Sequence, residues 1–240
     1  MAGHSKWANI KHRKERVDNK RGKAFSRAVK EIYIAAKLGG EDAAANPRLR
    51  LALQKAREVN LPKDNIDKAI KRGTGKLEGS SYEEVRYEGY GPDGFAVIVD
   101  CLTDNRNRTT SEVRHAFTKH GGALGTDGSV AYMFERVGQF LYAPGCDQDQ
   151  VVELGVDAGA ADYAIEEDGS VELLADPADF EKIHAYLAER QPPDAAEITL
   201  RPQSSVSLEG ERGDKAKRLL EALEDCDDTQ QVYSNAQLLG

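Results

Sequence analysis

Cationic side chains crowd the start of the sequence. Nine groups able to carry positive charge lie within eighteen positions, namely Lys6, Lys11, His12, Arg13, Lys14, Arg16, Lys20, Arg21 and Lys23. Arg27 extends the run. Such side chains bind phosphate oxygens, and the counterions released from the phosphates make the affinity strongly dependent on salt. Trp7 lies in the same stretch, where its ring can stack on an unpaired base. These residue types predict a nucleic-acid-binding site.

Two other interpretations of this stretch stay open. A basic run is often the solvated face of a helix, and Trp7 can instead be a hydrophobic anchor that ties the arm to a helical bundle. Eleven Lys and Arg side chains among residues 1–37 oppose only three acids, however. Because their mutual repulsion is a cost that folding alone does not explain, we favour polyanion binding.

A second cationic group follows the first strands, in the segment DNRNRT (104–109). Arg106 and Arg108 are expected on a turn before a helix, where guanidinium groups and exposed amides can hold phosphate. The same residues also fit an Asx-rich turn with solvated arginines. The glycine-rich loop at 121–128 can approach a nucleic-acid backbone closely, although a flexible connection is the favoured interpretation.

The charge of the chain is unevenly distributed. Residues 1–76 carry 20 basic and 8 acidic side chains, a formal charge of +12, whereas the remaining residues carry 13 basic and 33 acidic side chains, a charge of -20. The total is -8. This asymmetry predicts a polyanionic partner for the first part of the chain and repulsion of that partner by the rest.

Other function classes have no support in the sequence. We find no catalytic signature, so the chain is not expected to be an enzyme, and no cofactor or metal is expected. His115 and His120 have the wrong spacing for two zinc ligands on one helix face. Three widely separated cysteines fit a reducing compartment. With no apolar run long enough to span a bilayer and no secretory signal, a cytoplasmic protein that does not bind membranes is expected.

Three helices are predicted to position the cationic residues before residue 76. The first has an apolar stripe at helical spacing, with Lys and Arg on its other side, and ends at Gly39-Gly40. The second begins with Asn46 as its cap and Pro47 in its first turn. The third begins near Pro62 and stops at Gly73. Because each apolar stripe is narrow, the helices must cover one another in a small bundle.

The pattern changes to mixed strands and helices after residue 81. Residues 82–90 and 94–102 predict two strands, and residues 129–136 predict another. A helix is predicted from Thr109 to about Lys119, with Thr109 and Glu112 spaced as a capping box.

The next segment predicts a ferredoxin-like order of elements. Its strands and helices are expected, in β-α-β-β-α-β order, at 138–143, 147–158, 162–166, 170–175, 177–190 and 195–202. A polar stretch at 203–209 follows, then a helix around Leu219 and a short strand at 231–233. This last helix and strand are too small to fold alone and should complete the unit that begins at residue 80.

The predicted fold class is therefore α+β multidomain: an N-terminal helical bundle followed by two α+β domains, of which one is ferredoxin-like and inserted in the other. The expected boundaries are 1–79 for the basic helical domain, 80–136 plus 204–240 for one α+β domain, and 137–203 for the ferredoxin-like domain.

Several motifs together resemble the YebC/PmpR family. They are MAGHSKWANIKHRK at the start, NPRLR (46–50), YEGYGPDG (87–94), DNRNRT (104–109), GTDGSVAYMF (125–134) and LEDCDD (223–228). The likeness covers essentially the full chain and implies the same three domains. It also implies that there are no catalytic residues to carry over.

The resemblance implies two possible functions. Bacterial members are described as DNA-binding transcriptional regulators, whereas others, such as the mitochondrial translational activator of a cytochrome oxidase subunit, act on ribosomes and help translation through consecutive prolines. A basic arm with one aromatic residue suits DNA and rRNA equally. The function expected is a nucleic-acid-binding regulator of gene expression, of the transcriptional type, with a ribosome-associated factor that binds rRNA as the alternative. The sequence indicates no oligomeric state.

Overall fold

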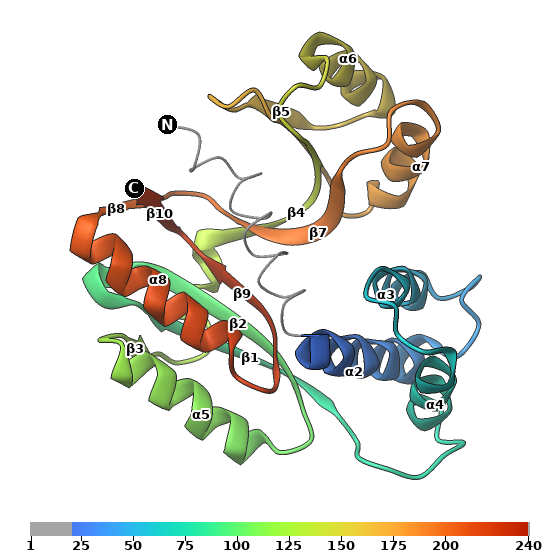
Figure 1. The fold of residues 1–240 in the computed structure, drawn as a ribbon, viewed down its shortest axis with the longest axis vertical. Helices are drawn as coiled ribbons and strands as arrows, with labels where there is room; N and C mark the ends of the chain where they lie inside the picture. The colour runs from blue at the N-terminus through green and yellow to red at the C-terminus, as the bar shows by residue number, and fades with distance from the viewer. Residues whose placement is uncertain (1–20, 240) are drawn as a thin grey trace. The chain divides into compact units, whose positions relative to one another are not determined.

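The computed structural model describes residues 21–239. Contacts divide these residues into two compact units (Figure 1). The helix–sheet unit contains residues 21–130 and 214–234, and the ferredoxin-like unit contains residues 131–213 and 235–239. The α+β class, with N-terminal helices followed by two sheet-containing parts, is confirmed. The three domain boundaries given above stay a proposal.

The three predicted helices are present. They are α2 (Arg21–Gly39), α3 (Pro47–Glu58) and α4 (Lys63–Gly73). Small and aliphatic side chains from all three form one buried cluster, in which Ile32 and Leu49 are fully buried. The apolar stripes therefore cover one another, as expected for helices that are too polar to stand alone.

Asn46 fixes the turn between α2 and α3. Its side chain accepts a hydrogen bond from the Leu49 amide, which confirms the predicted cap. Its amide also donates to the carbonyl oxygens of Ala35 and Gly40, at 2.8 and 2.9 Å. A Cβ atom at Gly39 would lie 2.6 Å from the Asn46 side chain, so the close approach requires glycine there.

A four-stranded antiparallel sheet forms the rest of the helix–sheet unit. Its order is β3-β1-β2-β9, and its strands are β1 (Glu83–Tyr90), β2 (Ala96–Thr103), β3 (Ala123–Leu124) and β9 (Thr229–Ser234). Helices α5 (Arg106–Lys119) and α8 (Gly210–Glu224) lie over this sheet (Figure 1). The predicted last strand thus pairs with β2 and completes the sheet begun near residue 80.

Glu88 ties the glycine-rich loop to the sheet. This β1 residue is buried, and its carboxylate accepts hydrogen bonds from the amides of Gly128 and Val130, both at 2.8 Å. Ala123 and Leu124 add a short strand beside β1. The expected flexible connection at 121–128 is therefore a loop held by backbone and side-chain hydrogen bonds.

The predicted strand at 129–136 is wrong for its first part. Residues Ala131–Met133 form a 3-10 turn, and the strand β4 (Phe134–Tyr142) begins only after it. Tyr132 is 70% exposed rather than buried in a strand face. The reason is that the Val130 amide donates its hydrogen bond to the Glu88 carboxylate and not to a neighbouring strand.

The ferredoxin-like unit has the predicted topology. Its elements in chain order are β4, α6 (Gln148–Ala158), β5 (Asp162–Ile165), β6 (Val171–Ala175), α7 (Phe180–Arg190) and β7 (Ala195–Pro202). The sheet order is β5-β6-β4-β7, and neighbouring strands are antiparallel. Phe140 of β4 and Phe180 of α7 stack with their ring centroids 5.0 Å apart, which fixes the helix on the sheet.

Two short strands were not expected. Residues 203–209 were predicted as a polar stretch, but β8 (Val206–Glu209) pairs in parallel with β10 (Ala236–Leu239). Leu208 is fully buried. Within residues 21–239, no helix is long and apolar enough to cross a membrane.

A substitution at Glu88 tests its hold on the loop. Glu88→Gln keeps one acceptor oxygen but turns amide hydrogens toward a backbone N–H, so we expect the free energy of unfolding to fall by about 1–3 kcal/mol. Urea denaturation measures the change. The control is Glu83→Gln on the same strand, where the side chain is exposed and the expected change is below about 0.5 kcal/mol. Equal effects of the two substitutions would contradict the assignment.

Candidate nucleic-acid interface

Most of the predicted binding residues precede the described part of the chain. Lys6, Trp7, Lys11, His12, Arg13, Lys14, Arg16 and Lys20 lie outside the described residues. Arg21 is the first residue of α2, and its side chain is not described. Lys23, Arg27, Arg106 and Arg108 can be placed, and they all belong to the helix–sheet unit.

Lys23 and Arg27 face the C-terminal end of α8. Lys23, Arg27 and Lys30 are spaced by four and three positions, so they share one face of α2. Lys23 Nζ donates to the carbonyl oxygen of Asp225, and Arg27 donates to that of Glu224 at 2.5 Å. Carbonyl groups at a helix C-terminus lack partners within the helix and carry partial negative charge. Lys23 and Arg27 therefore supply hydrogen-bond donors to carbonyl oxygens at the C-terminal end of α8.

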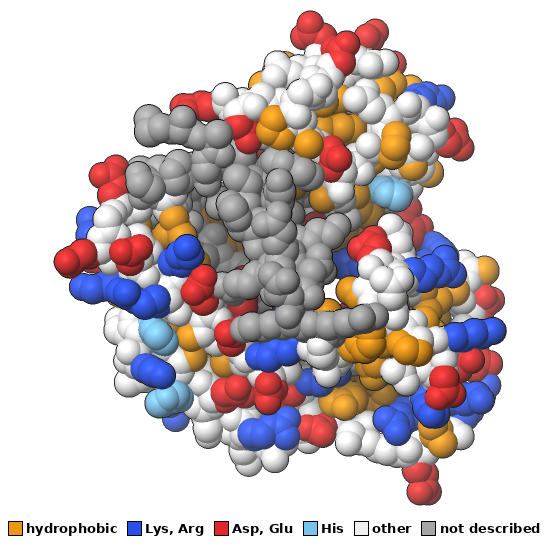
Figure 2. Space-filling view, viewed as in Figure 1, with side chains coloured by type: hydrophobic (Ala, Val, Ile, Leu, Met, Phe, Trp, Pro, Cys, Tyr) orange, Lys and Arg blue, Asp and Glu red, His pale blue; other side chains and the backbone are white. Residues whose placement is uncertain are grey.

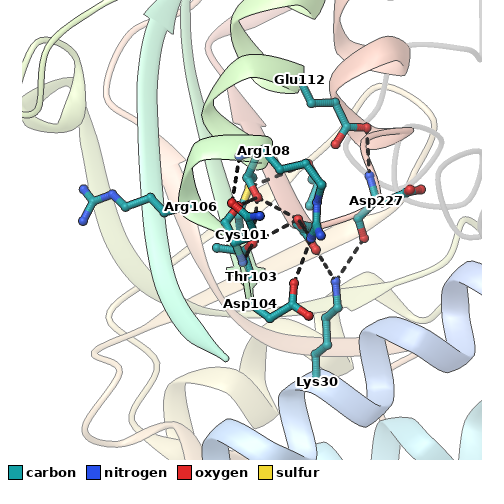
Figure 3. Close-up of polar contacts among 12 residues, drawn as sticks. Lys30, Cys101, Thr103, Asp104, Arg106, Arg108, Glu112 and Asp227 are labelled. Atoms are coloured by element: carbon teal, nitrogen blue, oxygen red, sulfur yellow. Dashed lines mark hydrogen bonds and ion pairs between the residues drawn. The ribbon is translucent and has the colours of Figure 1, made fainter. Parts of the chain in front are cut away.

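The third cation of this face meets a buried carboxylate. Lys30 Nζ lies 2.6 Å from Asp228 Oδ1 and 3.3 Å from the Asp227 carbonyl oxygen (Figure 3). The other carboxylate oxygen, Asp228 Oδ2, lies 2.7 Å from an Arg108 nitrogen. Asp228 is only 2% exposed. One carboxylate thus joins α2, the first turn of α5 and the turn that follows α8.

Two threonine hydroxyls complete the surroundings of Asp228. Thr103, at the end of β2, and Thr109, in α5, lie 3.0 and 2.7 Å from Asp228 Oδ2, and 2.7 Å from each other. Both threonines are fully buried. Each oxygen of the carboxylate therefore has a cationic donor, and Oδ2 has hydroxyl donors as well, which is the condition for keeping a charge away from water.

The start of α5 differs from the prediction, and this difference places Arg108. Asn105, not Thr109, caps the helix by accepting a hydrogen bond from the Arg108 amide at 3.1 Å. The predicted capping box of Thr109 and Glu112 is wrong because Thr109 turns inward to Asp228. Glu112 instead accepts a hydrogen bond from the Asp227 amide. The two arginines consequently lie within the first turn of α5 rather than on the preceding turn.

Arg106 and Arg108 point in different directions. Arg108 binds both Asp228 and Asp104, at 2.7 and 3.0 Å, and these hydrogen bonds raise the pKa of its guanidinium above the ordinary value. Arg106 extends away from this cluster (Figure 3). Its exposed side chain has no hydrogen bond or ion pair with another described residue. Of the pair, only Arg106 has its guanidinium uncommitted within residues 21–239.

Asp228 stays ionised far below neutral pH. Burial alone would raise the pKa of its carboxyl, but hydrogen bonds from Lys30, Thr109 and Arg108 outweigh burial and lower the pKa from 3.8 to about 2. Because the folded state holds the charged form, this carboxylate stabilises the fold above its ordinary pKa.

The cluster offers ion pairing rather than nucleophilic chemistry. Burial raises the pKa of Cys101 and of Cys226 to about 12, so their thiols stay protonated at neutral pH. Among residues 21–239, no group of three or more His, Cys, Asp or Glu side chains could hold a metal ion.

No motif in the sequence marks Lys30, Thr103 or Asp228 as site residues. A signal was present, because the acidic run LEDCDD and the basic face of α2 have opposite charges. Nothing in the sequence shows that residues nearly two hundred positions apart meet.

Comparisons with known proteins give consistent results. Residues 5–76 match the family model for the TACO1/YebC protein N-terminal domain, and residues 82–236 match the model for the TACO1/YebC second and third domain. A protein of Polynucleobacter asymbioticus is 54% identical over 99% of this chain and 100% of its own length, and one of Paraburkholderia xenovorans is 56% identical over 98% of both chains. Both are named probable transcriptional regulatory proteins.

One solved structure resembles the chain closely. The crystal structure of a conserved hypothetical protein from Aquifex aeolicus is 44% identical, covers 93% of both chains and has a TM-score of 0.83. The likeness supports the α+β fold described above.

Removing one hydroxyl near Asp228 tests the cluster. Thr109→Val keeps the shape of the side chain but removes a donor to a buried charge, so the free energy of unfolding should fall by about 1.5–3 kcal/mol. Thr118→Val is the control, since that hydroxyl is exposed on the same helix and bonds only the Arg114 carbonyl. Urea denaturation measures both. A loss at Thr109 no larger than that at Thr118 contradicts the role of the hydroxyl.

The low pKa of Asp228 gives a pH prediction. As pH falls from about 4 to about 2, protonation of this carboxyl should remove about 2 kcal/mol from the free energy of unfolding. The Thr109→Val variant lacks one donor that lowers the pKa, so its loss should begin at higher pH. Urea denaturation from pH 6 to about pH 2 compares the two proteins. Identical pH profiles would show that Thr109 does not stabilise the Asp228 carboxylate.

Proposed function

This chain belongs to the TACO1/YebC family, and we propose that it is a cytoplasmic regulator of gene expression that binds DNA through its basic N-terminal helical domain. The observation that carries the proposal is the charge of that domain, +12 over residues 1–76 in a chain of net charge -8. A DNA duplex presents a dense array of phosphates, and neutralising them with Lys and Arg is the main source of sequence-independent affinity.

Unpaired cations on the described helices support the proposal. The side chains of Lys55, Arg57, Lys63 and Lys71 have no hydrogen bond or ion pair with another described residue. Figure 2 shows Lys and Arg side chains over α3 and α4, interspersed with Asp and Glu. Such unpaired groups are available to neutralise phosphates, which then release the counterions condensed on the nucleic acid.

The names of the relatives favour regulation over catalysis. The two bacterial relatives described above are named as transcriptional regulators and not as enzymes. The protonated cysteines of the helix–sheet unit offer no ready nucleophile. We therefore propose a binding protein whose N-terminal cations hold the nucleic acid.

The proposal predicts a strong local effect of the N-terminal cations. Replacing Lys6, Lys11, Arg13 and Lys14 by Gln should make DNA binding much weaker. It should also reduce the magnitude of the slope of log affinity against log salt concentration by about 3–4. The control replaces four cations of α8, namely Arg212, Lys215, Lys217 and Arg218, by Gln, which changes the net charge equally. Fluorescence anisotropy with a labelled duplex at several salt concentrations measures both. Equal effects would show that net charge alone acts, and the proposed site would be wrong.

The target is identified in cells. Crosslinking followed by sequencing of the recovered nucleic acid should enrich discrete promoter regions over random DNA if the protein regulates transcription. Recovery of rRNA without promoter enrichment would replace DNA by the ribosome as the target. Loss of either signal in the four-Gln N-terminal variant, but not in the α8 variant, assigns binding to the N-terminal domain.

A further inference from the structure

Lys23 and Arg27 are engaged by the chain itself. The acidic turn, defined here as residues 224–228, offers them carbonyl oxygens at its beginning, and the Asp227 carboxylate lies 3.8 Å from Lys23 Nζ. A phosphodiester offers the Lys23 and Arg27 donors an acceptor that carries a full negative charge. We propose that Lys23 and Arg27 form a phosphodiester-binding site that the acidic turn closes in the free protein, and that nucleic acid opens it by displacing the turn. This inference rests on the proposed function.

The outer contacts of the turn are weak enough to exchange. Asp227 is 81% exposed and Lys23 is 31% exposed, and exposed ion pairs of this kind add little stability. The hydrogen bond from Arg27 to the Glu224 carbonyl oxygen has a neutral acceptor. Hydrogen bonds between a guanidinium and a phosphate are charge-assisted on both sides and roughly twice as strong as bonds between neutral groups. Phosphate therefore competes favourably for these two side chains.

Phosphate cannot share the cations with the turn without a cost. Glu224, Asp225 and Asp227 bring three carboxylates to the segment that contacts Lys23 and Arg27. Repulsion between like charges at short range opposes a phosphate beside them. Binding at these cations thus favours a state in which the turn has moved away.

The inner contacts of the turn hold its base in place. Lys30 and Asp228 form a buried pair at 2.6 Å, and Arg108 binds the same carboxylate. The Asp228 carbonyl oxygen also accepts a hydrogen bond from the Leu102 amide at 2.9 Å, beside the sheet. Breaking a buried pair costs far more than breaking an exposed one. We therefore expect displacement of residues 224–227 while Asp228 stays bound.

Hydrogen exchange on the full chain measures the displacement. The reporters are the amides of Asp225, Cys226 and Asp227, which bond to Glu221, Leu223 and Glu112, respectively. When a random-sequence DNA duplex saturates the protein, these amides should exchange faster. The amides of β2 (Ala96–Thr103) should keep their protection. Unchanged or slower exchange of residues 225–227 in the complex overturns the inference.

A charge-neutral variant of the turn gives an independent readout. Asp227→Asn should tighten binding of the same duplex about two- to fivefold, as the strength of exposed ion pairs implies. The control is Asp67→Asn, an exposed carboxylate on α4 in the same unit, which changes the net charge equally. In a Lys23→Gln background the gain from Asp227→Asn should disappear, because the pair it opens no longer exists. Equal gains at Asp227 and Asp67 would show only bulk repulsion and would overturn the inference.

The two proposals fail in different ways. If the unchanged protein binds neither DNA nor RNA, the proposed function and this inference are both wrong. If it binds, but the turn keeps its protection and the two Asp→Asn variants behave alike, only the closed site is wrong.

Discussion

Burial of the Asp228 carboxylate is the constraint on which the helix–sheet unit depends. A charge removed from water is tolerated only when cations and hydrogen-bond donors surround it, and here the donors come from three separate segments of the chain. Lys30 belongs to the helical bundle, whereas Thr103 and Arg108 belong to the strand and helix beyond it. The buried pair of Lys30 and Asp228 therefore attaches the bundle to the sheet, and water cannot replace either partner at low cost. The weaker contacts of Lys23 and Arg27 lie around this fixed point.

Much of the fold follows from local patterns. The three N-terminal helices have clear apolar stripes and caps, and the alternation of elements between residues 134 and 202 gives the ferredoxin-like order. The expectations that are wrong share one cause, which is a side chain or strand that arrives from far along the chain. Glu88 takes the backbone amide of Val130 from a position 42 residues earlier. The parallel pair of β8 and β10 joins segments that periodicity cannot connect.

The residue types of the site could be predicted from the sequence, but the pairs that they form could not. The excess of Lys and Arg at the start of the chain is visible in the sequence, and so is the acidic run before the last strand. Which cation meets which acid is decided by tertiary structure, because Lys30 and Asp228 are 198 positions apart and Arg108 and Asp228 are 120 apart. Asn105 and Thr109 were both acceptable caps by residue type. Only the demand of the buried carboxylate for hydroxyl donors directs Thr109 inward.

The attachment of α2 to the end of α8 has a consequence for the order of events during synthesis. The strands and helices of the ferredoxin-like unit from Phe134 to Pro202 are contiguous, so they can pair soon after they emerge. A nascent chain that stops before Glu224 already carries every cation of α2 but lacks the carbonyl and carboxylate acceptors that residues 224–228 offer to Lys23, Arg27 and Lys30. In such a chain these three side chains of α2 can meet a surrounding polyanion, and residues 224–228, which are translated after the ferredoxin-like strands and helices, engage them later.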